Sequence, residues 1–435
     1  MKFYDRELET ENLRRIEKLS SMHAQMTVIT GRRRIGKTSL IKHALRNIPT
    51  VYFFVSKKSE TLHCKELTEI VNSVLNEPLG EFSSMAKLFE ALMIISKRKN
   101  FTLIFDEFQN YAYVNPALFS EFQNIWDTHK DESKINLVFC GSIFSLMNKI
   151  FADNKEPLYG RATNRITVRP FSIQTLKNII VDHNPDCKPD DILAFYTITG
   201  GVAKYVEQLA DNSAFTLESI FKTVFSFGSY FINEGKDMLT DEFSKDYGKY
   251  FSVLEAIANG NTTRAQINNY VEFECGGYLD KLENNYNIIA KMRPLGFDTN
   301  SKNVKYSLAD NFLNFWFRFV YRYRSAVEIN NFDFLIQKLK QDYNTYSGQM
   351  LERLFRQKYL ESGAYNIVTN FWTKNGENEI DLVAVNELDK KCLIAEIKRD
   401  PQRANIMLLK QKSESLPPKY RKMRKDFLIL GLEDI

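Results

Sequence analysis

The sequence predicts an α/β fold whose first third is a parallel β-sheet with helices on both faces. Apolar runs of strand length alternate there with stretches of helical spacing, which is typical of a sheet covered on both sides. After about residue 171 the spacing becomes mainly helical, which indicates a different architecture for the rest of the chain. The expected strands are 25–30, 50–55, 101–105, 135–139 and 165–168, and the expected helices are 37–44, 82–97 and 117–128.

The length and composition indicate several folded domains. A chain of 435 residues is too long for one ordinary domain, and 44% hydrophobic residues allow each of two to four domains to bury a core. No apolar signal region or run of about 18 apolar residues occurs, so no membrane span is expected. Five dispersed cysteines without a C-x-x-C pair favour a reducing cytoplasm. The net charge of +5 suits a nucleic-acid partner or a solvated basic surface equally well.

A phosphate loop is the strongest motif. Residues 31–38, GRRRIGKT, match the pattern G-x-x-x-x-G-K-[ST] between an expected strand and an expected helix. The glycines let backbone N–H groups face phosphates, and the helix N-terminus adds partial positive charge. Lys37 would reach the β- and γ-phosphates of ATP, and Thr38 would bind Mg²⁺. The flanking strand and helix disfavour the alternative of an empty glycine-rich turn. The expected nucleotide-binding residues here are Gly31, Arg34, Gly36, Lys37, Thr38 and Ser39.

Two acidic residues end the buried strand 101–105. A phosphate loop needs a second carboxylate on the magnesium side, at the end of a neighbouring strand. Asp106 would hold Mg²⁺ through water, and Glu107 would orient and deprotonate the attacking water. An ordinary acidic strand end is the alternative interpretation.

The strand 50–55 lies in sequence between the loop strand and the Asp106 strand. This order, with a glutamate directly after the aspartate, resembles the additional-strand ATPases, which include the AAA+ and STAND groups. The resemblance implies a polar residue that ends the next strand and senses the γ-phosphate. Ser142 fits that place, and Cys140 is a weaker alternative; a surface serine is the other interpretation.

Two arginines follow the turn at 157–160. An arginine can stabilise the charge on the γ-phosphate in the transition state, within the molecule or toward a neighbour. Arg161 and Arg165 are therefore candidates for this role, with a surface ion pair as the alternative.

The region 176–240 is expected to form a helical lid, and 241–328 a winged helix. Helices at 250–258, 264–270 and 278–285 precede short strands at 288–292 and 305–308, with the wing tip at 298–301. The helix that would enter a DNA groove carries only Lys281 against Asp280 and Glu283. This poor match to DNA favours a structural or protein-docking role.

The last region, 329–435, carries a second chemical signal. A connecting helix at 332–341 precedes a unit that begins near Gly348 and runs helix, strand, strand, helix, strand. A hairpin would bring Asp381 close to Glu396, and strand alternation puts Lys398 on the side of Glu396. Paired carboxylates can bind Mg²⁺, and a nearby lysine can orient or activate water. Glu352, on the preceding helix, would add a third ligand.

This C-terminal arrangement resembles the PD-(D/E)xK nuclease superfamily, with Asp381, Glu396 and Lys398 at its motif positions and Glu352 as the helix acid. A salt-bridged hairpin that keeps the fold without cutting is an equally weighted alternative. The tail from 401 to 435 has eight basic residues against four acidic ones, which suits either a phosphate backbone or a solvated helix face.

The landmarks together resemble one family along nearly the whole chain: the archaeal-type ATPases of the STAND class with a C-terminal DUF234 region. They are the opening FYDRE at 3–7, the phosphate loop, FDEF at 105–108, GS at 141–142, PLYGR at 157–161, TGGVAKY at 199–205, YSLAD at 306–310 and FWFRF at 315–319. Two positions depart from the family pattern, since Asp5 stands where a glycine is usual and Ala203 where a proline is usual. The resemblance also implies that the opening segment contacts adenine.

The expected protein is an additional-strand ATPase core (1–175) with a lid, a winged helix and a restriction-endonuclease-like domain. Its expected function is an ATP-dependent switch that controls a Mg²⁺-dependent DNA nuclease site. The alternative is a nucleotide-driven regulator or scaffold whose C-terminal domain only binds nucleic acid or protein. The expected partners are ATP, DNA and a protein at the winged helix, and the oligomeric state is left open.

Overall fold

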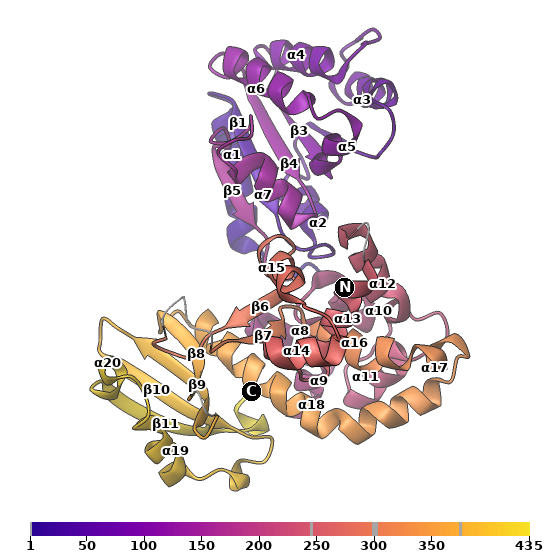
Figure 1. The fold of residues 1–435 in the computed structure, drawn as a ribbon. Coiled ribbons are helices and arrows are strands. Elements are labelled where there is room, and N and C mark those ends of the chain that lie inside the picture. The colour runs from indigo at the N-terminus through magenta and orange to yellow at the C-terminus, as the bar shows by residue number, and fades with distance from the viewer. Residues whose placement is uncertain (1, 244–246, 298–302, 374–375) are drawn as a thin grey trace. The chain divides into compact units, whose positions relative to one another are not determined.

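The chain forms two compact units in the computed structural model (Figure 1). The first unit is Asp5–Arg169, and the second is Pro170–Ile435 together with the start of the chain before Asp5. The structure describes residues 2–243, 247–297, 303–373 and 376–435. The break at residue 170 lies near the boundary expected at 175, whereas the boundaries expected at 240 and 328 fall inside the second unit and remain predictions.

The first unit is built on a five-stranded, all-parallel sheet in the order β2-β3-β4-β1-β5. The strand that precedes the phosphate loop, β1, therefore pairs with β4 and not with β3, the strand that ends in Asp106. A strand inserted at this place defines the additional-strand arrangement, so the predicted fold class is confirmed. The strands are β1 (Gln25–Thr30), β2 (Thr50–Phe54), β3 (Phe101–Asp106), β4 (Ile135–Cys140) and β5 (Asn164–Thr167).

Helices cover both faces of this sheet. Alternate residues of β3 and β4, such as Phe105 and Phe139, join a large core with helices α3, α4 and α6. The residues between them, such as Val138, are buried on the opposite face, where α1 contacts β1 and β4. No helix was expected at α1 or α3. The helices are α1 (Glu7–Ser20), α2 (Lys37–Ala44), α3 (Glu60–Leu75), α4 (Met85–Ser96), η1 (Phe108–Asn110), α5 (Tyr111–Val114), α6 (Leu118–His129) and α7 (Phe144–Ala152).

The second unit begins with helices, as predicted. Helix α9 is buried at every position from Asp191 to Thr199, and it ends at the pair Gly200–Gly201. These glycines have φ of +53° and +79°, and a Cβ at Gly201 would lie 2.5 Å from the carbonyl oxygen of Phe171. The turn therefore requires glycine. The helices are α8 (Ile173–His183), α9 (Pro189–Thr199), α10 (Ala203–Asp211), α11 (Leu217–Val224) and α12 (Tyr230–Phe243).

Three helices and an antiparallel hairpin follow, which is the predicted order of a winged helix. Strands β6 and β7 pair with Ile289 opposite Leu308. The predicted wing tip at 298–301 lies outside the described residues. The elements are α13 (Tyr247–Ala258), α14 (Arg264–Val271), α15 (Gly276–Asn284), β6 (Ile289–Met292) and β7 (Lys305–Leu308), followed by α16 (Asn311–Phe319), η2 (Tyr321–Tyr323) and α17 (Arg324–Glu328).

The C-terminal part packs one long helix against a mixed four-stranded sheet in the order β11-β10-β9-β8. Strands β8, β9 and β10 are antiparallel neighbours, and β11 runs parallel to β10. The elements are α18 (Phe332–Glu361), β8 (Ile367–Trp372), β9 (Glu379–Asn386), β10 (Lys391–Ile397), η3 (Pro401–Arg403), α19 (Ile406–Ser413), α20 (Pro418–Arg421), β11 (Arg424–Leu430) and η4 (Leu432–Asp434).

Two predictions for this part were wrong. The connecting helix and the helix near Gly348 are one 30-residue helix, α18. Apolar positions such as Leu339, Tyr346 and Leu354 stay buried along it, and their packing outweighs the roughly 1 kcal/mol that an internal glycine costs. The sheet also has a strand that was not predicted, β8, whose polar Thr369 and Asn370 interrupt the apolar pattern of a strand.

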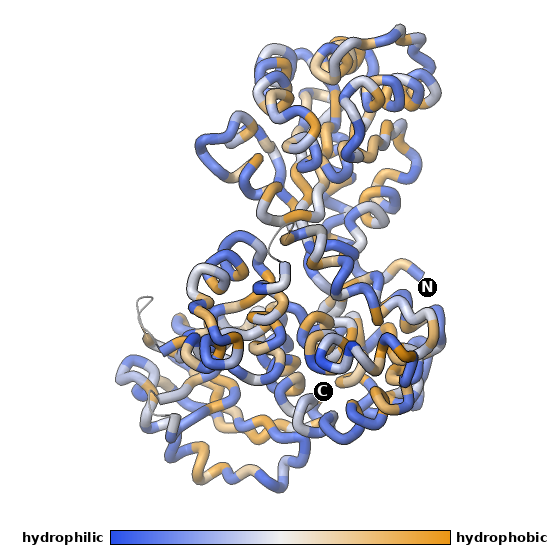
Figure 2. Tube along the Cα trace, turned by 45° about the vertical axis from the view of Figure 1, so that its right-hand side comes forward, coloured by the Kyte–Doolittle hydropathy of each residue, from blue (hydrophilic) through white to orange (hydrophobic). Residues whose placement is uncertain are grey.

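No helix among the described residues is both long enough and apolar enough to cross a membrane. Polar and apolar stretches alternate along the trace in Figure 2.

Candidate functional site

The phosphate loop connects β1 to α2 in a conformation that depends on its glycines. Gly31 and Gly36 have φ of +149° and +94°. A Cβ at Gly31 would lie 2.7 Å from the carbonyl oxygen of Val168, just beyond the neighbouring strand β5. Helix α2 begins at Lys37, directly after Gly36. The backbone therefore has the strand–loop–helix form expected for a phosphate site.

The Lys37 ammonium points back into the loop. Its Nζ donates hydrogen bonds to the carbonyl oxygens of Gly31 at 2.9 Å and Arg32 at 3.2 Å, and the residue is only 7% exposed. Burial lowers the pKa of Lys37, because a desolvated ammonium is costly. A buried cation beside a helix N-terminus fits an anionic ligand such as a polyphosphate.

The carboxylate of Asp106 faces the helix that follows the loop. Its Oδ2 accepts hydrogen bonds from Thr38 Oγ1 at 3.0 Å and from the Tyr52 hydroxyl at 2.5 Å. Burial and the neighbouring Asp106 raise the pKa of Tyr52 well above its ordinary value, so the phenol remains a donor. The structure thus brings together the two expected Mg²⁺ residues, Thr38 and Asp106. Tyr52 was missed because it looks like an ordinary strand aromatic.

Glu107 has a left-handed backbone, with φ of +54°, and its carboxylate is held in place. Glu107 Oε2 accepts a hydrogen bond from Ser142 Oγ at 2.8 Å and another from Gln109 Nε2. The structure thus connects the two residues expected to handle the attacking water and the γ-phosphate. Burial raises the pKa of the Cys140 thiol well above its ordinary range, so the thiol stays neutral, and Ser142 rather than Cys140 is the residue that contacts Glu107 here. The contribution of Gln109 was not predicted.

Both candidate arginines have partners inside the first unit. Arg161 donates from Nε at 3.0 Å and from Nη2 at 2.8 Å to Asp127 of α6, and from Nη1 at 2.7 Å to the carbonyl oxygen of Pro157. Arg165 donates to the carbonyl oxygen of Phe151. A role for either arginine at the γ-phosphate requires that these contacts break, and it remains a prediction.

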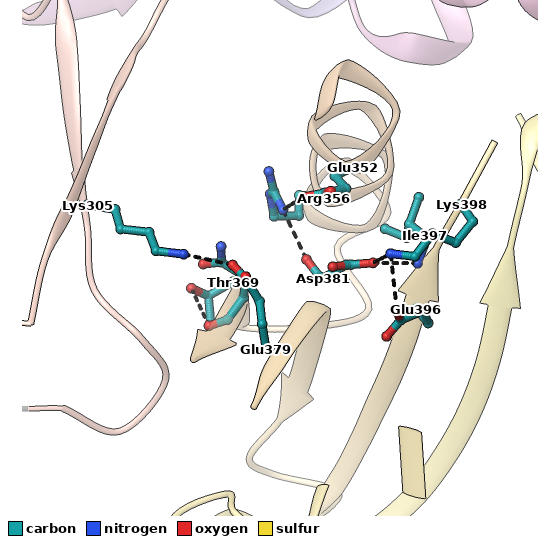
Figure 3. Close-up of polar contacts among 10 residues, drawn as sticks. Lys305, Glu352, Arg356, Thr369, Glu379, Asp381, Glu396, Ile397 and Lys398 are labelled. Carbon is teal, nitrogen blue, oxygen red and sulfur yellow. Dashed lines mark hydrogen bonds and ion pairs between the residues drawn. The ribbon is translucent and has the colours of Figure 1, made fainter. Parts of the chain in front are cut away.

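A second cluster of charges lies where β9 and β10 pair in the C-terminal sheet (Figure 3). Asp381 Oδ2 accepts a hydrogen bond from the backbone N–H of Ile397 at 2.8 Å. The ammonium of Lys398 lies 3.0 Å from this same oxygen and 3.1 Å from Glu396 Oε1. The hairpin therefore brings together the three predicted residues, with the lysine bridging the carboxylates.

Two further cations contribute to this cluster. Lys412, on α19, lies 3.2 Å from Glu396 Oε2, so each oxygen of Glu396 has its own lysine. Arg356, on α18, donates to the carbonyl oxygen of Asp381 at 3.0 Å and contacts Glu352 at 3.4 Å. Neither residue was predicted at this site: Lys412 was counted only as part of the basic tail, and no sequence signal distinguishes it there.

Glu352 lies on α18 and faces the same cluster (Figure 3). Burial, and then the negative charge of Asp381, raise the pKa of Glu352 to about 7. Burial also raises the pKa of Asp381. Burial opposes the charge on Lys398, but the two carboxylates raise its pKa overall. These shifts are those of a partly desolvated and mutually dependent group of charges.

The chemistry of the two carboxylates suits a divalent cation, because Mg²⁺ prefers carboxylate oxygens. Lys398 now supplies the positive charge between them. Within the described ranges, no three His, Cys, Asp or Glu side chains are close enough together to hold a metal ion. A third ligand from Glu352 therefore remains a prediction.

Comparisons with known proteins agree with this architecture. The family described as an ATPase domain predominantly from Archaea matches residues 3–209, and DUF234, described as archaeal and bacterial proteins of unknown function, matches residues 316–408. A protein of Methanocaldococcus jannaschii, MJECL04, is 31% identical to this chain over 441 residues, covering 99% of this chain and 93% of that protein. The chain belongs to this family of archaeal-type ATPases.

Two solved structures share the fold. The Walker-type ATPase PABY2304 of Pyrococcus abyssi has a TM-score of 0.54 at 19% identity, over 72% of this chain and 96% of that one. The ORC2 protein of Aeropyrum pernix, solved in ADPNP–ADP complexes, has a TM-score of 0.52 at 13% identity, over 78% of this chain and 96% of that one. At these identities the likeness shows the fold alone.

The structure explains why the family pattern has a glycine and a proline at the two departures. Asp5 has a φ of +59°, a conformation that favours glycine. Its own Oδ1 accepts a hydrogen bond from the backbone N–H of Arg6 at 2.8 Å, which helps an aspartate to adopt it. Ala203 is the first residue of α10, where proline is favoured and alanine is tolerated.

Proposed function

We propose that the first unit binds and hydrolyses ATP. The carrying observation is the buried Lys37 ammonium at the start of α2, with the hydrogen-bonded pairs Thr38–Asp106 and Ser142–Glu107 beside the loop. The loop backbone and Lys37 would hold the phosphates. The Aeropyrum ORC2 structure contains ADPNP and ADP, which supports nucleotide binding by this fold.

Thr38 and Asp106 would hold the Mg²⁺ ion, which would neutralise charge on the β- and γ-phosphates. Glu107 would accept a proton from the attacking water, and Ser142 would orient Glu107 through the hydrogen bond already present. The remaining loop residues, Gly31, Arg34, Gly36 and Ser39, would line the phosphates.

We propose that the second unit cleaves DNA phosphodiester bonds with the help of Mg²⁺, under the control of the nucleotide. The observation that carries this proposal is the position of the Lys398 ammonium between Asp381 and Glu396. The two carboxylates would hold the metal, which would polarise the phosphate and lower the pKa of a bound water. Lys398 would then be free to orient the water or the phosphate.

The charge balance of this cluster supports the phosphodiester substrate. Lys398 and Lys412 already pair with the carboxylates of Asp381 and Glu396, and Arg356 contacts that of Glu352. A divalent cation would add two positive charges, so the loaded site would attract an anionic phosphate.

A second candidate function is a nucleotide-driven regulator with an inactive C-terminal domain. One observation favours it: the lysines pair both carboxylates without any ligand, as in a structural ion network. The domain would then bind nucleic acid or a protein partner. In either case the winged helix would serve as a docking module, since Lys281 lies between acidic neighbours on α15.

The deciding experiment is a cleavage assay on plasmid, linear and single-stranded DNA with Mg²⁺, with and without ATP. Wild-type protein should cut at least one substrate, and Asp381→Asn and Lys398→Met should each lose the activity. Lys391→Met is the matched control, because Lys391 lies on the same strand but pairs with Asp426. Absence of cleavage of every substrate by the wild type would favour the regulator.

The dispersed cysteines favour a cytoplasmic location. All five are free thiols in the structure, and Cys64, Cys140, Cys275 and Cys392 are buried. Reduced cysteines are typical of the cytoplasm.

A further inference from the structure

Arg399, the residue after Lys398, is held in place by the helical part of the second unit, through a group of contacts that we call the clamp. Arg399 Nη1 and Nη2 each lie 2.8 Å from a different oxygen of Asp190, 209 residues earlier in the chain. Two parallel N–H···O bonds of this kind fix both the distance and the orientation of the partners. Asp190 is the second residue of α9.

The same guanidinium is also fixed to α18. Arg399 Nη1 donates to Ser347 Oγ at 2.7 Å, and the guanidinium lies 5.3 Å from the ring centre of Tyr343. The Tyr343 hydroxyl donates to Asp190 at 3.1 Å and completes the cluster. Arg399 is only 19% exposed. Helices α9 and α18 therefore hold the end of β10, immediately beside Lys398.

A second link joins α9 to the candidate site. The hydroxyl of Tyr196 donates to Gln357 Oε1 on α18 at 2.9 Å. Gln357 is the neighbour of Arg356, which contacts both Glu352 and the carbonyl oxygen of Asp381. Tyr196 lies six positions after Asp190, which is about 9 Å along the helix. One helix therefore contacts the neighbours of the charge cluster on both β10 and α18.

Helix α9 is suited to act as a rigid spacer. It is buried from Asp191 to Thr199, and Asn311 Nδ2 donates to the carbonyl oxygen of Tyr196 at 3.0 Å. Its N-terminal turn holds the end of β10 beside Lys398, and its middle holds the α18 segment that carries Glu352. Buried, packed helices move as units rather than deforming.

We propose that Arg399, with Asp190 and Tyr196 of α9, positions Lys398 and Glu352 relative to Asp381. A displacement of α9 would change this geometry, which makes α9 the element through which the rest of the second unit controls the site. This inference rests on the proposed phosphodiester cleavage for its catalytic consequence. The clamp itself stands on the contacts above.

The test compares Asp190→Asn and Arg399→Lys with wild type in the full-length protein. Both variants break the two-pronged ion pair, and Arg399→Lys keeps the positive charge. We expect kcat for DNA cleavage to fall about 10- to 100-fold, with KM within about 3-fold, because substrate contacts remain. The reversed pair, Asp190→Arg with Arg399→Asp, should recover a substantial part of kcat.

Lys391→Met is the control, since Lys391 lies on the same strand, β10, and its 3.0 Å ion pair is with Asp426 of β11. It should leave kcat unchanged within about 2-fold, as an exposed pair has little effect. An equal loss in this control would overturn the proposal, because any ion pair of the sheet would then have the same effect.

A readout independent of cleavage is hydrogen exchange at the Ile397 amide, which donates to Asp381. We expect this amide to exchange at least 10-fold faster in Asp190→Asn and Arg399→Lys, while amides of the first unit keep their wild-type rates. Unchanged kcat and unchanged Ile397 exchange would refute the clamp. If the wild type cuts no DNA but the exchange changes as expected, the proposed nuclease fails and the clamp stands. If Asp190→Asn does not fold, the milder Arg399→Lys decides.

Discussion

The two candidate sites differ in how their lysines are balanced. In the first unit, the Lys37 ammonium rests on neutral carbonyl oxygens, and Asp106 is held by two hydroxyl groups. In the second unit, the Lys398 ammonium lies directly between two carboxylates, and Lys412 pairs with one of them. At the first site, the lysine and the aspartate form hydrogen bonds with separate neutral groups. At the second site, lysines and carboxylates pair directly and neutralise one another.

This difference has a consequence for ligand binding. An anionic ligand at the first site would gain an interaction with a buried cation whose hydrogen bonds go to carbonyl oxygens and not to a carboxylate. A divalent cation at the second site must first displace Lys398 from the carboxylates. To bind their ligands, Lys37 would leave two carbonyl oxygens and Lys398 would leave two carboxylates. The second site therefore needs the larger rearrangement, which makes it the better target for control by neighbouring helices.

The largest expected effect is the loss of nucleotide turnover when the buried cation of the phosphate loop, Lys37, is removed. Lys37→Met should lower the rate of ATP hydrolysis by at least about 100-fold and weaken the binding of a fluorescent ATP analogue. Lys65→Met, an exposed position on α3, should leave both unchanged. Wild-type turnover in Lys37→Met would contradict the assignment of the loop.

The pH dependence of stability should expose the charge coupling of the second site. Burial and Asp381 raise the pKa of Glu352 from 4.5 to about 7. Between these values the folded chain holds a proton that the unfolded chain has lost, so the free energy of unfolding falls as the pH rises. Glu352→Gln should remove this slope and stabilise the second unit at pH 8 by at most about 3 kcal/mol.

This prediction is measured by urea unfolding between pH 4 and 8. A Trp126→Phe background leaves Trp316 and Trp372, both in the second unit, as the fluorescent reporters. Glu433→Gln, at an exposed position of the same unit, should keep the wild-type slope. If the free energy of unfolding of Glu352→Gln still fell with pH as in the wild type, Glu352 would not be coupled to the charge cluster of Asp381 and Lys398.

Removing Lys398 and removing Lys37 should have opposite effects on the stability of the ligand-free protein. Lys398→Met removes the cation between Asp381 and Glu396 and leaves Lys412 on Glu396 alone. It should lower the free energy of unfolding by about 1–2 kcal/mol, a value reduced because the lysine side chain is 38% exposed. Lys37→Met removes a buried charge that forms no ion pair within the described part of the chain, and should leave stability unchanged or raise it. Thermal unfolding of both variants without nucleotide or metal provides the measurement. If Lys37→Met lowered the unfolding temperature and Lys398→Met did not, the proposed difference in charge balance between the two sites would be wrong.

The smallest effect should come from the serine that holds Glu107. Ser142→Ala removes the 2.8 Å hydrogen bond to Glu107 and should reduce kcat for ATP hydrolysis about 10-fold, with nucleotide affinity almost unchanged. Ser120→Ala, an exposed residue of α6, is the control. A loss of affinity as large as the loss of kcat would instead place Ser142 among the nucleotide contacts.

Local sequence patterns were sufficient where neighbours in space follow from regular structure. The parallel strands place Asp106 at the sheet edge beside the loop, and the hairpin pairs the region of Asp381 with that of Glu396. Local sequence patterns failed where tertiary packing outweighs the local preference of a segment. Gly348 suggested an interruption inside α18, and the polar residues of β8 concealed a strand, because burial against the rest of the unit was not visible in either segment.

The sequence by itself determined the alternation of strands and helices, the phosphate loop and the carboxylate–lysine hairpin, because each depends on short-range spacing and on the periodicity of strands and helices. The additional-strand order was an expectation from the resemblance to known ATPases. The tertiary structure alone decided the partners of these groups. Tyr52 reaches Asp106, Lys412 reaches Glu396 and Asp190 reaches Arg399. These contacts join residues from 16 to 209 positions apart through side chains of common types, so only the packing of the elements shows which charges meet and which remain without an ionic partner.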